Sequence, residues 1–130
     1  MTLMDPLAHA FSTIVNNEAR YKHECVVEPA SKLLGQVLRV IQKNGYLGEF
    51  EFVDDGRSGK FKIQLLGRIN KCGVVKPNFS VKVDRIEMFE ERYLPSRDVG
   101  ILILSTPKGV VSHKEAINLQ TGGKILAYVY

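Results

Sequence analysis

Several features that would assign a chain to a familiar class are missing from these 130 residues. No apolar run approaches the ~18–20 residues that a membrane helix needs, so no membrane association is expected. Neither a low-complexity tract nor an internal repeat is present. Hydrophobic residues make up 45% and charged residues 25% of the chain, which is too apolar for a disordered protein. We therefore expect a globular protein of one or two small domains.

Cysteine is scarce. Cys25 and Cys72 stand alone, with no Cys-x-x-Cys pattern and no histidine at ligand spacing. Two reduced thiols in partly buried strands are expected, with no metal site, which favours a cytoplasmic protein. The first ten residues contain Asp5 and Pro6 and lack a basic segment, so no signal peptide is expected.

Catalytic motifs are also lacking. None of the three histidines lies in a Gly-x-Ser-x-Gly or His-Glu-x-x-His pattern, and His113 is interpreted as a solvent-facing residue in the first turn of a helix. The acidic pairs Asp54-Asp55 and Glu90-Glu91 are interpreted as turn and surface charge. The segments 107–109 and 122–124 contain glycine and lysine but complete no phosphate-binding loop. We expect no enzyme and no cofactor.

Periodicity predicts an αβαββ order for the first half of the chain. The expected elements are a helix at residues 6–20, a strand at 25–27, a second helix opened by residues 29–31 and ended by 44–45, and a hairpin with strands at 49–52 and 60–65 around a turn at 54–59. Asp5-Pro6 is a helix-start signal, and Gly45 suits the left-handed end of the second helix.

The second half is expected to be mostly β with a short helix. The expected elements are a strand at 69–76, a charged stretch at 81–93 compatible with a short helix, a strand at 100–104, a short helix after residue 112, and a final strand at 124–130. The continuously apolar run 100–104 predicts a strand buried on both faces, and Ser112 with Glu115 forms a capping box. The predicted fold is α+β, with domains 1–66 and 67–130 meeting near Gly67.

The net charge of +4 is unevenly distributed. Residues 1–30 carry −2, residues 31–66 carry +2, and residues 67–130 carry +4, from ten basic and six acidic side chains. The second half is therefore the part expected to face a polyanion.

Two segments carry candidate polyanion contacts. The connector 105–109 is interpreted as a polar loop that leaves the buried strand and runs into the capped helix. Its hydroxyls, glycine and lysine suit contacts with RNA, and the amides after Ser112 favour an anion. Ser31-Lys32 opens the second helix in a similar way. Ordinary capping and an ordinary connector would explain the same residues equally well.

Motifs along essentially the whole chain resemble the small-subunit ribosomal protein family numbered eight in the universal scheme. They are, in order, Met4–Leu7, Pro29–Leu33, Asn44–Phe50, Asn70–Gly73, Arg92–Arg97, Ser105–Ser112 and Thr121–Tyr130. Each motif is weak alone, but seven in this order are specific. The stretch from Pro77 to Pro95 resembles the archaeal and eukaryotic branch, and the first and fifth motifs resemble archaeal members.

The resemblance implies a structural, non-enzymatic constituent of the small ribosomal subunit, monomeric when free. It implies direct binding to the central domain of 16S-type rRNA, a role in subunit assembly, and neighbouring small-subunit proteins as partners. RNA contacts are implied at Asp5, Pro6, Ser31, Lys32, Ser105, Thr106, Pro107, Lys108, Gly109, Ser112, Gly122 and Gly123. Pro107 stands where bacterial members typically carry a third hydroxyl residue, so this chain lacks one expected side-chain hydrogen bond.

The expected mechanism is docking onto a folded RNA, in which basic residues contact phosphates and the connector reads irregular nucleotides in the minor groove. This requires that the connector and the start of the second helix form one surface. Two alternatives stay open at this point. A small enzyme would bind a nucleotide at the glycine-lysine turns, and a protein–protein adaptor would form no tight, salt-dependent RNA complex.

Overall fold

The computed structural model describes residues 6–28, 30–54, 56, 59–75, 80–96 and 99–130. The chain divides into two compact units, residues 1–72 and 73–130, and each unit is described by itself. The division falls a few residues beyond Gly67, where the sequence predicts the domain boundary. Helices and antiparallel strands occur together, so the predicted α+β class is confirmed.

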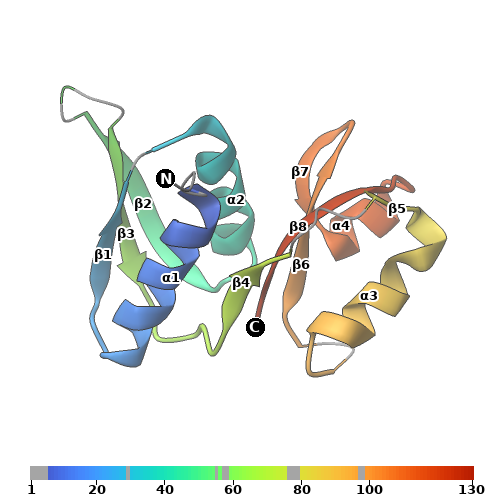
Figure 1. The fold of residues 1–130 in the computed structure, drawn as a ribbon, viewed down its shortest axis with the longest axis horizontal. Coiled ribbons are helices and arrows are strands. Elements are labelled where there is room, and N and C mark those ends of the chain that lie inside the picture. The colour runs from blue at the N-terminus through green and yellow to red at the C-terminus, as the bar shows by residue number, and fades with distance from the viewer. Residues whose placement is uncertain (1–5, 29, 55, 57–58, 76–79, 97–98) are drawn as a thin grey trace, which may run out of the picture. The chain divides into compact units, whose positions relative to one another are not determined.

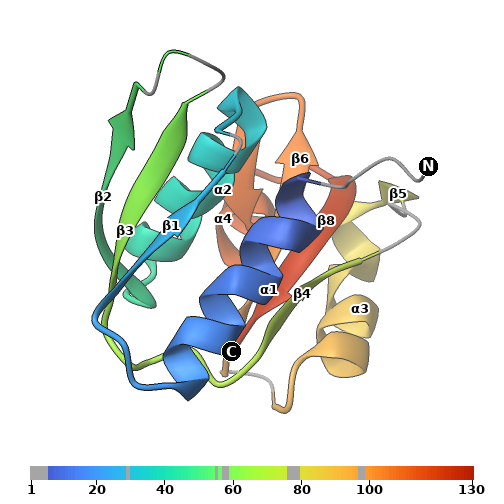
Figure 2. The ribbon, with the colours of Figure 1, turned by 60° about the vertical axis from the view of Figure 1, so that its left-hand side comes forward.

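The first unit places two helices against one face of a three-stranded antiparallel sheet (Figures 1 and 2). Its elements are α1 (Pro6–Ala19), β1 (Glu24–Val27), α2 (Lys32–Lys43), β2 (Leu47–Val53) and β3 (Lys60–Leu65). The strand order is β1-β3-β2. The predicted αβαββ order is therefore confirmed.

Local signals account for α2. The Ser31 hydroxyl accepts a hydrogen bond from the Leu34 amide at 3.1 Å and so satisfies one of the unpaired amides at the start of the helix. The helix ends at Lys43, and Gly45 follows with a φ of 85°, a conformation that glycine adopts without strain. Its buried stripe consists of Leu34, Val37, Leu38, Val40 and Ile41. Burying each such side chain contributes about 1.5–3 kcal/mol.

Alternation positions the sheet against the helices. Phe61 and Ile63 of β3 are buried, whereas Lys62 between them is exposed. Ile63 pairs with Cys25 of β1 and Phe50 of β2, so these residues share the face that the helices cover.

A buried carboxylate holds the segment that follows β3. Glu18 of α1 is only 9% exposed, and its two oxygens accept hydrogen bonds from the Gly67 amide at 3.2 Å and the Ile69 amide at 3.0 Å. Because these donors satisfy a charged acceptor that is removed from water, Glu18 fixes this segment against α1.

The second unit is built on a larger sheet. Its elements are β4 (Cys72–Val74), β5 (Ser80–Val81), the 3-10 turn η1 (Val83–Arg85), α3 (Ile86–Tyr93), β6 (Ile101–Thr106), β7 (Gly109–Ser112), α4 (His113–Asn118) and β8 (Gly123–Val129). The strand order is β4-β8-β6-β7, and β5 pairs with β8.

The strand predicted at residues 69–76 is shorter in the structure, where only Cys72–Val74 is a strand. The amide of Ile69 is already bonded to Glu18, so it is not available to a neighbouring strand. Residues 76–79, including the predicted break at Pro77, lie outside the described residues.

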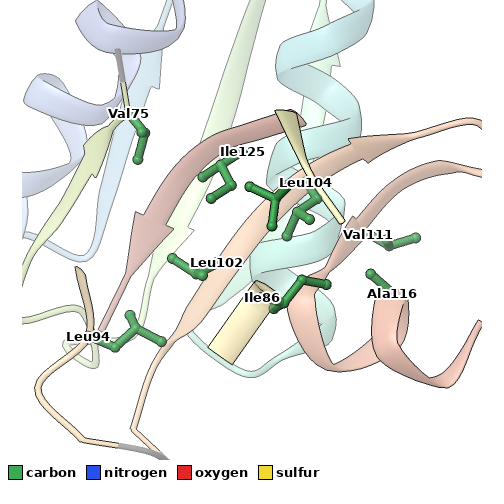
Figure 3. Close-up of a cluster of buried hydrophobic side chains, with 9 residues drawn as sticks. Val75, Ile86, Leu94, Leu102, Leu104, Val111, Ala116 and Ile125 are labelled. Carbon is green, nitrogen blue, oxygen red and sulfur yellow. The ribbon is translucent and has the colours of Figure 1, made fainter. Parts of the chain in front are cut away.

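The core of the second unit lies between its sheet and α3 and α4 (Figure 3). Leu102 and Leu104 of β6 and Ile125 of β8 pack with Ile86 of α3 and Ala116 of α4. On the opposite face of β6, Ile101 and Ile103 are also buried. The prediction of a strand buried on both faces is therefore confirmed.

The prediction that residues 105–109 form a polar loop leading directly into a helix is wrong. Ser105 and Thr106 end β6, Gly109 begins β7, and only Pro107 and Lys108 lie between the two strands. The missed strand β7 contains Val111, which pairs with Leu104 and is buried in the core. Burial of Val111 in this core favours continued strand pairing beyond the turn.

Candidate nucleic-acid interface

Strands β6 and β7 form a hairpin (Figure 1), and the hydroxyl of Thr106 holds its tip. Thr106 pairs with Gly109 across the hairpin, and its Oγ1 donates to the Gly109 carbonyl at 2.7 Å. The same oxygen accepts a hydrogen bond from the Lys108 amide at 3.1 Å. Because a hydroxyl has one donor and two acceptor positions, Thr106 has only one acceptor position left for an outside partner. Its main role is therefore to fix the shape of the tip.

Ser105 differs from Thr106. It is half-buried, and its hydroxyl forms no hydrogen bond with another described residue. Pro107, Lys108 and Gly109 are exposed beside it. The tip thus presents a free hydroxyl, a rigid ring, a cation and an open backbone, which together suit contacts with a sugar or a base edge.

The Lys108 ammonium contacts the end of α4. Its Nζ donates to the carbonyl of Leu119, the residue that caps this helix, at 3.3 Å. A cation at a helix C-terminus is stabilising, so the contact has a structural use. An ammonium has three donors, and the exposed side chain keeps two of them for a phosphate.

Two glycines lie close to this tip because they have no side chain. A Cβ at Gly123 would collide with the Ser105 carbonyl, and a Cβ at Gly122 would collide with the Val81 carbonyl. The structure therefore brings Gly123 beside Ser105 and Thr106 at the end of β6, whereas Gly122 lies beside β5.

Ser112 has a different environment from the tip. It is 5% exposed, and its Oγ accepts a hydrogen bond from the Glu115 amide at 3.3 Å. The serine half of the predicted capping box is confirmed. An RNA contact at Ser112 stays a prediction, and its hydroxyl already serves α4.

The interpretation of His113 as a solvent-facing residue and of Glu90 as surface charge is wrong. His113 is 1% exposed and Glu90 is 8% exposed. The Nε2 of His113 lies 2.5 Å from Oε2 of Glu90, which joins the start of α4 to α3. The Glu90 side chain is buried because it finds this partner, which a solvated helix face would not provide.

The hydrogen bonds define which ring nitrogen carries the proton. The Leu102 amide donates to Nδ1 of His113 at 3.0 Å, so the proton of the neutral ring is on Nε2 and points to Glu90. Burial lowers the pKa of His113 below its ordinary value, although the hydrogen bond to Glu90 opposes this effect. The pair therefore anchors α3 and α4 to β6, the strand that carries the hairpin.

The first unit holds the remaining candidates. Ser31 caps α2, and Lys32 is the exposed first residue of that helix. Pro6 begins α1, and Asp5 lies outside the described residues. That these residues and the hairpin tip form one surface stays a prediction.

The cysteines are free thiols, as predicted. Burial raises the pKa of Cys25 to about 11 and that of Cys72 to about 12, and in both cases the nearby Glu18 charge adds to the effect. Within the described residues, no group of three or more metal-ligating side chains comes together, and no helix is long and apolar enough to span a membrane.

Sequence reasoning missed the Glu90–His113 pair, because its two residues are 23 positions apart and no local pattern links them. It also missed β7, for which a signal was present. The β-branched pair Val110-Val111 follows the predicted strand at 100–104 after a five-residue connection that contains Gly109, and this spacing is typical of a hairpin.

Comparison with protein families identifies one matching family, described as ribosomal protein S8, whose model matches residues 5–130. The match covers nearly the whole chain and includes the hairpin tip, the paired glycines and the start of α2.

Proposed function

The chain belongs to the ribosomal protein S8 family, whose members are structural small-subunit proteins that bind rRNA, and we propose that it binds the central domain of that RNA directly. We further propose that it supports subunit assembly beside other small-subunit proteins, and that it belongs to the archaeal branch. The observation that carries the proposal is the exposed β6–β7 tip within a family match over residues 5–130.

The tip acts by shape. Thr106 holds the turn in one conformation, so the neighbouring Ser105 hydroxyl is oriented before the RNA arrives. A hydroxyl is both donor and acceptor and can bond a base edge or a 2′-hydroxyl in the shallow minor groove of an irregular stem. Because the turn is ordered in advance, little conformational entropy is lost on binding.

A cation and an open stretch of backbone complete the contact. Lys108 supplies an ammonium for a phosphate, and Gly109, where an added Cβ would meet nothing within 4 Å, lets the backbone come near the RNA. Gly122 and Gly123 act indirectly, because their missing side chains let β8 pack closely against β5 and the end of β6. These contacts position the protein on the RNA, whereas Ser105 distinguishes the cognate stem from other duplexes.

The first unit contributes the start of α2. Its dipole and the Lys32 ammonium both favour a phosphate there, and no acidic side chain lies in its first turn. Asp5, Pro6 and Ser112 are included as further contacts, on the basis of the family's motifs alone.

The proposal is tested by filter binding to the central-domain RNA and to a generic duplex RNA over a range of salt concentrations. Lys108→Ala should lower the slope of log affinity against log salt by about one contact on both RNAs. Lys62→Ala is the matched control, because Lys62 is exposed on the outer face of the first unit's sheet and pairs only loosely with Glu24, at 3.7 Å.

Variants of the two hydroxyl residues distinguish recognition of the RNA by Ser105 from stabilisation of the turn by Thr106. Ser105→Ala should weaken binding to the cognate stem more than to the generic duplex, since it removes a free hydroxyl. Thr106→Val should weaken binding because the turn loosens, and Thr106→Ser should restore it, since serine keeps the hydroxyl. Equal losses on both RNAs for Ser105→Ala would refute the reading role.

The two alternatives predict other results in the same assays. A nucleotide-using enzyme would show saturable binding of ATP or GTP by the purified protein. An adaptor would show no tight RNA complex and no salt dependence.

A further inference from the structure

An exposed aromatic ring lies beside the start of α2. Phe52 of β2 pairs with Phe61 of β3, so it belongs to the face of the sheet that the helices cover. Phe61 is 8% exposed, whereas Phe52 is 57% exposed. The two rings meet edge to face, with their centroids 6.0 Å apart. A largely buried ring therefore holds an exposed one in place.

The exposed ring borders a hollow of about 310 Å³. The hollow is lined by Ala30, Ser31, Lys32, Phe52 and Phe61. Among the described residues, Lys32 is the only charged one that lines it. A Cβ at Gly59 would collide with the Phe52 ring, so the ring also rests close to the backbone there. Phe52 is thus supported on the protein side and open toward the hollow.

We propose that this hollow, which we call the Phe52 hollow, binds an unpaired base of the small-subunit rRNA, stacked on the ring of Phe52. This inference rests on the proposed RNA-binding function and extends it to a second point of contact. Lys32 lines the same hollow and is exposed, so its long side chain can bring the ammonium to the phosphate of that nucleotide. Stacking on an aromatic ring tolerates any base, because every base has a flat π-face.

The lining favours a nucleotide over a protein segment. A flat base next to a phosphate needs one exposed ring beside one cation, and the hollow provides this pair in Phe52 and Lys32. A protein partner is usually held by a wider apolar core with a polar rim.

The chain contains no tryptophan, so a single Phe52→Trp substitution places the only indole of the protein in the hollow. The probe is the protein's own central-domain rRNA, transcribed in vitro. Phe52→Trp should keep the affinity of the wild type, and the RNA should quench the indole fluorescence because the base stacks on it. Generic duplex RNA should quench it much less, since its bases are already stacked and paired.

Affinity variants complete the test. Phe52→Ala and Phe52→Leu should both weaken binding of the central-domain RNA, by roughly five- to a hundred-fold. Leucine keeps an apolar side chain without a π-face, so it separates stacking from simple apolar contact. Tyr21→Ala is the matched control, because Tyr21 is 89% exposed in the same unit and lies outside the hollow, and it should leave the affinity unchanged. Thermal denaturation of each variant checks that the fold is kept.

The possible results separate this inference from the function on which it rests. If the wild type binds the central-domain RNA and Phe52→Ala binds it equally well, the stacking inference is overturned and the function stands. The inference is also overturned if Phe52→Leu binds this RNA with wild-type affinity. It is overturned as well if the indole of Phe52→Trp is quenched by another ribosomal protein but not by the RNA. Failure of the wild type to bind this RNA overturns the proposed function itself.

Discussion

Replacing Glu90 by alanine is expected to destabilise the second unit and to speed hydrogen exchange at the Leu102 amide. The change removes the acceptor for the buried Nε2 proton of His113, and a lost hydrogen bond to a charged group costs about 1.5–3 kcal/mol. One further buried methylene is lost, which adds about 0.8 kcal/mol. The free energy of unfolding of this unit should therefore fall by about 2–4 kcal/mol.

Hydrogen exchange at the Leu102 amide measures this effect directly, because that amide donates to the other nitrogen of the same ring. A loss of about 2 kcal/mol corresponds to an exchange rate about 30-fold higher, if exchange follows opening of the unit. Glu90→Gln should cost less, about 1 kcal/mol, since its amide oxygen still accepts the proton in a neutral hydrogen bond.

Glu91→Ala is the matched control. Glu91 follows Glu90 in α3 but is exposed, so its loss should change the free energy of unfolding by no more than about 0.5 kcal/mol. Equal exchange rates of the Leu102 amide in the Glu90→Ala and Glu91→Ala proteins would refute the reasoning, because they would show that the buried pair does not hold the ring.

Two further predictions concern titration. Because burial lowers the pKa of His113 in the folded protein, the unfolded chain binds more protons between that lowered pKa and about 6.5, so the free energy of unfolding should fall on acidification through this range. Thermal denaturation at pH 7 and pH 5 should show a smaller decrease for His113→Gln than for the wild type, and an equal decrease would contradict the assignment. The pKa values of about 11 for Cys25 and about 12 for Cys72 leave little thiolate at pH 8, so iodoacetamide should label both far more slowly in the native protein than in urea. Mass spectrometry follows the labelling, and equal rates in the two states would rule out the burial of these thiols.

The site could be predicted from the sequence only in part. The family motifs imply RNA contacts at the hairpin residues and at Gly122-Gly123, and the structure places Gly123 directly beside the end of β6. The sequence suggested two interchangeable hydroxyls at Ser105 and Thr106, whereas the structure commits one to the turn and leaves the other free. Which hydroxyl is bonded within the turn depends on the register of β6 against β7. Because β7 was not predicted, its register could not be predicted either.

Local patterns determined the order of helices and strands in the first unit, the cap at Ser31 and the turn at Gly45, because each of these signals lies within a few neighbouring residues. Only the tertiary structure decided the partners of the buried charges. Glu18 meets the amides of Gly67 and Ile69, 49 and 51 positions away, and Glu90 meets His113. From the sequence alone, an acidic residue in a charged helix is expected to be exposed to solvent. Whether another element buries it and donates a hydrogen bond to it depends on how distant segments pack.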